Sequence, residues 1–122
     1  MNRKLLLAAI AVIVPLSALQ AMTVAVFLEK ADALQARGMM AMFSSDIGLL
    51  KAEVNGATDR FKAENAAARR AGRAPNFCVP EGARLGSTEL LAYFRAIPPA
   101  QRQRMEVRDA LRGLMIRRYP CR

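Results

Sequence analysis

The sequence predicts an all-α protein, a small domain of four helices that follows an N-terminal signal peptide. Apolar residues recur at helical spacing along the chain, and no stretch sustains the apolar–polar alternation of a strand. The chain also opens with a short basic segment and an apolar run. Its 122 residues are enough for one small core. We therefore expect a single helical domain over residues 22–122.

Residues 1–21 have the pattern of a bacterial-type secretory signal. Arg3 and Lys4 form a basic start, Leu5 to Val14 is an unbroken apolar run, and Ala21 is a small residue at a plausible cleavage position. An uncleaved anchor is the alternative, because no charge occurs from Leu5 to Leu28 and roughly 20 such residues cross a bilayer. Cleavage makes the domain periplasmic, whereas an anchor holds it at the inner membrane with the basic start inside.

The charge and the missing residue types narrow the function. Loss of Arg3 and Lys4 with the signal lowers the formal charge from +9 to +7. The chain has no histidine, which is the usual general base and the commonest metal ligand. We therefore expect a protein that is not an enzyme, with no catalytic residue, metal or cofactor. The basic surplus predicts an acidic partner, such as a protein cleft, an anionic lipid surface or cell-wall polymer, and export argues against nucleic acid.

Cys78 and Cys121 are the only cysteines. An even pair in a small exported domain is most simply a disulfide. The spacing is not that of a CxxC redox motif, and two thiols without histidine are a poor zinc site. We expect a structural bond that clamps the last two helices.

The first predicted helix starts after Thr23, whose hydroxyl can cap it, and stops at Gly38. Its inward stripe comprises Val24, Phe27, Leu28, Ala31 and Leu34. The short apolar segment that follows contains Met39, Met40 and Met42. We interpret these methionines as adaptable core filling in preference to copper ligands.

The second predicted helix is capped by Ser44 or Ser45 and opens with Asp46 at its positive end. Its apolar face comprises Ile47, Leu50, Val54 and Phe61. An alanine-rich, charged extension should continue the helix to Gly72. The arginines at its end, at positions 69, 70 and 73, form either a solvated helix end or a basic contact for a partner.

Prolines and glycines between residues 74 and 82 predict a loop. Ser87 is expected to cap a third helix that ends at Pro98-Pro99 and faces inward with Leu90, Leu91 and Phe94. The fourth helix is predicted from about Gln101 or Met105 to Arg118, where Tyr119-Pro120 breaks it. Its buried face comprises Val107, Ala110, Leu111, Leu114 and Met115.

The last predicted helix also carries Arg104, Arg108 and Arg112 at steps of four residues. Glu106 and Asp109 fall on a different arc, at about 100° per residue, so they should not neutralise the row fully. A solvated face is the commoner explanation for such a row. Because this row borders the apolar face, it is our candidate for binding an acidic partner.

Two short motifs frame the second half of the chain. Phe77-Cys78-Val79-Pro80 leads into the third helix, Ala110-Leu111 lies in the fourth, and the chain closes on Tyr119-Pro120-Cys121. This stretch of about 45 of the 122 residues resembles the Rap/Tai family of periplasmic immunity proteins, which protect bacteria from peptidoglycan amidases delivered by type VI secretion. The resemblance implies an exported, all-helical inhibitor whose partner is a secreted amidase effector.

The resemblance has limits along this chain. A long Ala/Arg-rich extension replaces the family's compact Gly-containing helix, and Pro99 to Arg102 replaces its histidine-bearing stretch. No shared motif marks an effector-binding residue. The alternative is a basic envelope scaffold that binds anionic lipid or cell-wall material, and a homodimer is compatible with both interpretations.

Overall fold

The computed structural model describes residues 21–122, which form five α-helices and one 3-10 segment and contain no β-strand. The all-α prediction is thereby confirmed. The predicted signal, apart from Ala21, lies outside the described residues, so its cleavage stays a prediction. Among residues 21–122, no helix has the length and apolar character needed to cross a membrane.

The first half of the domain is a helical hairpin with a short turn. Helix α1 spans Val24–Arg37, the 3-10 segment η2 spans Gly38–Phe43, and the long helix α2 spans Ser45–Arg70. The predicted caps are confirmed: Thr23 Oγ1 accepts from the Val26 N–H at 3.3 Å, and Ser44 Oγ accepts from the Asp46 N–H at 3.2 Å. Gly38 ends α1 with a φ of 57°, a conformation that suits glycine.

The second half holds three helices where two were predicted. Helix α3 spans Ser87–Ala96, the short α4 spans Pro99–Arg102 and α5 spans Val107–Arg118. Ser87 was expected to cap α3, but it is the first helical residue and Gly86 occupies the cap position without a side-chain bond. The predicted start of the last helix at Gln101 was wrong, whereas the alternative start at about Met105 lies two residues before Val107 and the predicted end at Arg118 is confirmed.

A backbone contact with the start of α1 explains why α4 and α5 are separate. The Val24 N–H donates to Met105 O and the Val107 N–H donates to Met22 O, both at 2.9 Å. These bonds pair Thr23 with Glu106 as an isolated bridge, which requires extended backbone just before α5. A continuous helix through residues 103–106 would lose both bonds.

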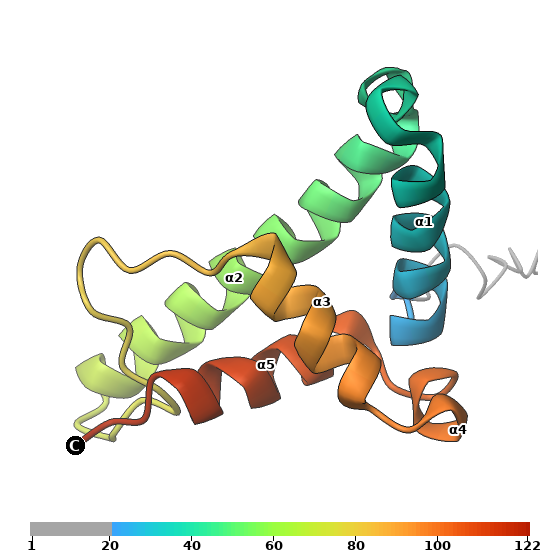
Figure 1. Ribbon diagram of the computed structural model, residues 1–122. Coiled ribbons are helices and arrows are strands. Elements are labelled where there is room, and N and C mark those ends of the chain that lie inside the picture. The colour runs from blue at the N-terminus through green and yellow to red at the C-terminus, as the bar shows by residue number, and fades with distance from the viewer. Residues whose placement is uncertain (1–20) are drawn as a thin grey trace, which may run out of the picture.

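The helices are arranged around α5, which lies below α2 in Figure 1 and is crossed by α3, with α1 upright at one end. The closely packed pairs are α2 with α5, α1 with α2, α1 with α3, and α3 with α5. Two edge-to-face aromatic contacts lie in the core, Phe27–Phe94 at 5.3 Å and Phe61–Phe77 at 5.7 Å between ring centroids. Phe61, Phe94, Leu111, Val24 and Val107 are the largest fully buried side chains.

The turn between α1 and α2 contradicts the prediction for the methionines. Met39, Met40 and Met42 are 84%, 68% and 75% exposed, and Phe43 is 85% exposed. We call these four residues the apolar tip. The tip lies at the far end of α1 from α5, and Ala41 is the one buried residue of η2. The segment forms the turn at the end of the helical hairpin, away from the core, and its apolar composition alone did not indicate this position.

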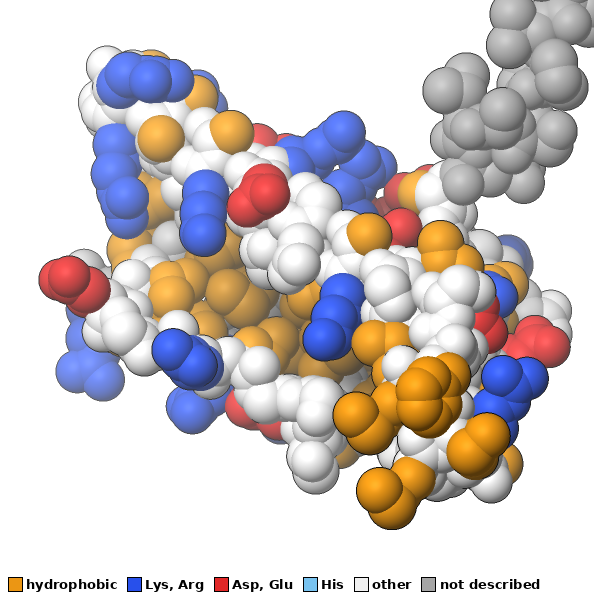
Figure 2. Space-filling model, turned by 90° about the horizontal axis from the view of Figure 1, so that it is seen from above, with side chains coloured by type: hydrophobic (Ala, Val, Ile, Leu, Met, Phe, Trp, Pro, Cys, Tyr) orange, Lys and Arg blue, Asp and Glu red, His pale blue; other side chains and the backbone are white. Residues whose placement is uncertain are grey.

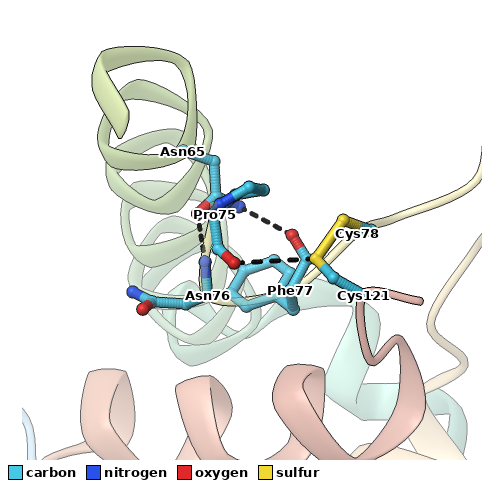
Figure 3. The surroundings of a disulfide bond; sticks show 6 residues. All are labelled: Asn65, Pro75, Asn76, Phe77, Cys78 and Cys121. Atoms are coloured by element: carbon cyan, nitrogen blue, oxygen red, sulfur yellow. Dashed lines mark hydrogen bonds between the residues drawn. A yellow bond between two sulfur atoms is a disulfide. The ribbon is translucent and has the colours of Figure 1, made fainter. Parts of the chain in front are cut away.

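The disulfide joins the loop after α2 to the tail after α5. Cys78 and Cys121 are bonded, with their Cα atoms 4.9 Å apart. The Cys78 N–H also donates to Tyr119 O at 2.8 Å, so backbone and side chain both tie the loop to the tail. Figure 3 shows Asn65 of α2 on the other side of the loop, where its Nδ2 donates to Phe77 O at 3.3 Å and its Oδ1 accepts from the Asn76 N–H at 3.4 Å.

Replacing both cysteines, as C78A/C121A, should lower the free energy of unfolding by about 4 kcal/mol, since the bond closes a chain segment with a sequence separation of 43. The measurement is urea unfolding of protein isolated from the periplasm. Reductant should destabilise the wild type by a similar amount and leave the double variant unchanged. Free thiols in the isolated wild type would contradict the bond.

Candidate functional site

A deep groove runs between α2 and α3. It has a volume of about 850 Å³, and Figure 2 looks down on its apolar floor, with Lys and Arg side chains around the opening. The groove exists because both helices pack on α1 and α5, while within residues 21–122 α2 and α3 do not form a closely packed pair with each other. The loop after α2 completes one wall.

The groove is lined by apolar side chains from α1, α2, α3, α5 and the loop after α2. Phe27, Ala31 and Leu34 come from α1, and Leu90 and Leu91 come from α3. The other apolar residues come from α2, the loop and α5: Ile47, Leu50, Val54, Phe61, Phe77, Val79, Ala83, Leu85, Met115 and Tyr119.

The predicted inward face of α2 therefore has two environments. Leu50 and Phe61 are buried in the core, as expected. Ile47 and Val54 are half-buried and line the open groove. Helical periodicity identified this face correctly, but it does not indicate whether another element of the same chain covers it.

The charged residues of the groove have one sign. Lys51, Lys62 and Arg69 of α2 line it, and among residues 21–122 no Asp or Glu does. None of the three cations lies within 4.0 Å of a carboxylate in the described part of the chain, where five other ion pairs are formed. Arg69 is thus a groove residue, whereas Arg70 and Arg73 lie outside the lining.

The buried polar side chain of the groove lining is hydrogen-bonded within the domain. Asn65 is 9% exposed and bonds through its amide to the backbone of residues 76 and 77. Because both ends of this amide are used, Asn65 holds the loop against α2 and does not offer an unpaired group to a ligand. The groove can therefore bind an apolar surface and form ion pairs with anionic groups that lie along α2.

The predicted arginine row is not one continuous surface. Arg112 forms two bonds to the Glu64 carboxylate, Nη1 to Oε2 at 2.7 Å and Nη2 to Oε1 at 3.4 Å. Its guanidinium also lies 4.7 Å from the centroid of the Phe61 ring. Arg112 therefore joins α5 to α2.

The other two arginines of the row have different surroundings. Arg108 pairs with Glu106 at 3.1 Å, so this one member of the row is neutralised by a carboxylate on the same part of the chain. Arg104 is exposed and precedes α5, whose first residue is Val107, so it is not on the helix at all. The row as a binding surface remains a prediction, with Arg104 its most accessible member.

The Arg112–Glu64 pair has a clear electrostatic signature. The hydrogen bond from Arg112 lowers the pKa of Glu64 from its ordinary value of 4.5, against the effect of burial, and the Arg112 charge lowers it further. The same hydrogen bond raises the pKa of Arg112. Both side chains are partly exposed, so the pair orients the two helices more than it stabilises them.

Metal-ligating groups and reactive thiols can be examined over the described residues. Over residues 21–122, no three His, Cys, Asp or Glu side chains lie together so that they could hold a metal ion. Both cysteines are in the disulfide. Comparison with family models, curated proteins and solved structures finds no match to this chain. The resemblance to Rap/Tai immunity proteins therefore stays a prediction from the sequence.

Glu64→Gln should remove an acid-sensitive part of the stability. The pair contributes fully above pH 4.5 and is lost as the pH falls through the lowered pKa of Glu64, because the protonated carboxyl no longer attracts Arg112. The variant should lose about 1 kcal/mol or less at pH 7, and its unfolding free energy should fall less than that of the wild type between pH 5 and pH 3. Glu53→Gln, on the same helix and outside the ion pairs of the described residues, is the control.

Proposed function

We propose that this chain is an exported, non-catalytic binding protein of the immunity type, which holds a secreted peptidoglycan amidase and blocks access to its active site. The groove between α2 and α3 carries the proposal. It is large, largely apolar and built from four helices, and its charged residues are all cationic. Such a site fits the capture of an acidic partner by contact and charge.

The disulfide supports this interpretation in two ways. It fixes the loop that forms one wall of the groove, because Cys78 lies directly before Val79, which lines the wall. It also joins the two motifs, Phe-Cys-Val-Pro and Tyr-Pro-Cys, on which the resemblance to the Rap/Tai family depends. Because the loop is already fixed before the partner binds, it loses little conformational entropy on binding, which favours a tight complex.

Inhibition needs no chemistry from this chain. A domain of this size seated beside a catalytic cleft excludes a polymeric substrate by its volume. The net charge of +7 over residues 22–122, which is the full +9 without Arg3 and Lys4, speeds encounter with an acidic partner. In this proposal the groove provides the affinity, and the surface charge increases the association rate.

The apolar tip favours a second candidate, a scaffold that binds the anionic envelope surface. Met39, Met40, Met42 and Phe43 are exposed together, and they form the apolar cluster at the right of Figure 2. Arg37 ends the adjacent α1. An exposed apolar cluster beside a cation is suited to the headgroup region of anionic lipid.

Co-expression with a secreted amidase, should one be encoded beside this gene, is expected to protect cells, and the two proteins are expected to co-purify. Val79→Glu, which places a charge in the groove wall at a 45% exposed position, should weaken the complex at least about tenfold and reduce protection. Ile116→Glu is the matched control, since Ile116 is 43% exposed and outside the groove. No complex and no protection with any neighbouring amidase would refute the immunity role.

The envelope candidate makes a separate prediction. The double variant Met39→Ser, Phe43→Ser should release the protein from vesicles that contain phosphatidylglycerol, because it removes the two most exposed apolar side chains of the tip. Vesicle co-sedimentation at rising salt measures this, with purely phosphatidylcholine vesicles as the control. Equal sedimentation of wild type and variant would exclude the tip as a membrane contact.

A further inference from the structure

The cations of the groove form one line along α2. Lys51, Lys62 and Arg69 are separated by 11 and 7 residues, and therefore by 18 residues in all. At 3.6 residues per turn these intervals are close to three, two and five whole turns, so the three side chains leave the helix on nearly the same side. The line is about 27 Å long at 1.5 Å per residue.

This line of charge borders the apolar lining. On α2, Ile47, Val54 and Phe61 line the groove on the face next to it. An occupant must therefore present an apolar surface and, along one edge of that surface, anionic groups over about 27 Å. That combination describes an amphipathic helix with acidic residues on one flank.

We propose that the groove binds an acidic amphipathic helix of the partner protein, laid along α2, with three carboxylates opposite Lys51, Lys62 and Arg69. This inference rests on the proposed function for the identity of the partner. A helix parallel to α2 meets the cations with acidic residues at i, i+11 and i+18. An antiparallel helix meets them at i, i+7 and i+18.

The spacing of the cations distinguishes this occupant from a lipid. A fatty acid or phospholipid carries its negative charge at one end, so it would pair with one cation and leave the other two unmatched. The three cations lie at intervals along the whole line and not as a cluster at one end. A peptide helix repeats its charged flank along its length, and so it matches all three.

A second copy of this chain is a poor occupant. The domain is strongly basic, and five of its ten carboxylates are already in ion pairs within the described residues: Asp32, Asp46, Glu64, Glu89 and Glu106. Asp46, Glu53 and Glu64 of α2 have the antiparallel spacing, but the first and last of them pair with Lys30 and Arg112. Two copies would therefore have to break internal pairs to complete the match.

The test uses protein isolated from the periplasm and a fluorescent helical peptide with a leucine face and glutamates at i, i+7 and i+18. The triple variant K51E/K62E/R69E should weaken peptide binding at least about tenfold, because each exposed pair is replaced by repulsion. The variant R60E/R70E/R73E has the same change in net charge on residues outside the groove lining, and it should weaken binding about threefold or less.

The inference is overturned by equal loss in both triple variants, by equal binding of a peptide with lysines in place of the glutamates, or by displacement of the peptide by palmitate or phosphatidylglycerol vesicles at comparable concentration. Sedimentation of a dimer that the peptide dissociates would assign the groove to a second copy and also overturn the inference.

If the amidase binds K51E/K62E/R69E as tightly as wild type, the inference fails while the proposed function stands. If the peptide binds selectively but no amidase does, the groove assignment stands and the immunity role fails.

Discussion

The groove depends on one constraint, which is that α2 is held at its two ends and left open along one side between them. At its start, Asp46 pairs with Lys30 of α1 at 3.2 Å. Toward its end, Phe61 and Asn65 are buried, and Asn65 holds the loop that the Cys78–Cys121 bond ties to the tail of α5. These attachments lie on α1, α5 and the loop, and within residues 21–122 α3 is not closely packed against α2.

The ion pairs of the domain follow the same arrangement. One pair joins each closely packed couple of long helices: Lys30–Asp46 for α1 and α2, Arg95–Asp32 for α1 and α3, Arg112–Glu64 for α2 and α5, and Arg118–Glu89 for α3 and α5. Exposed pairs contribute little stability, so the core and the disulfide hold the fold while these pairs favour one packing of the helices. Each pair neutralises one cation and one carboxylate, so the net positive charge of the domain is carried by cations outside these pairs.

Local chemistry made much of the fold predictable. Thr23, Ser44 and Gly38 act within a turn of themselves, so the ends of α1 and the start of α2 could be placed from the sequence. The disulfide followed from an even cysteine count. By contrast, the break before α5 depends on backbone hydrogen bonds to Met22 and Val24. The ion pair of Arg112 depends on Glu64, which is 48 residues away in the sequence. Contacts of this kind leave no local pattern, so the arginine row was predicted as one surface.

The groove is a second feature that the local sequence pattern predicts only in part. The apolar periodicity of α2 predicted that Ile47 and Val54 would face the core. They do lie on the apolar face of the helix, but this part of the face borders the open groove. An amphipathic helix is incomplete until something covers its apolar face, and in this domain the covering element is missing from residues 21–122 over part of α2. The stripe of Lys51, Lys62 and Arg69 beside that face then specifies the charge of whatever covers it. The same property that makes a helix predictable from its sequence therefore makes its missing neighbour partly predictable as well.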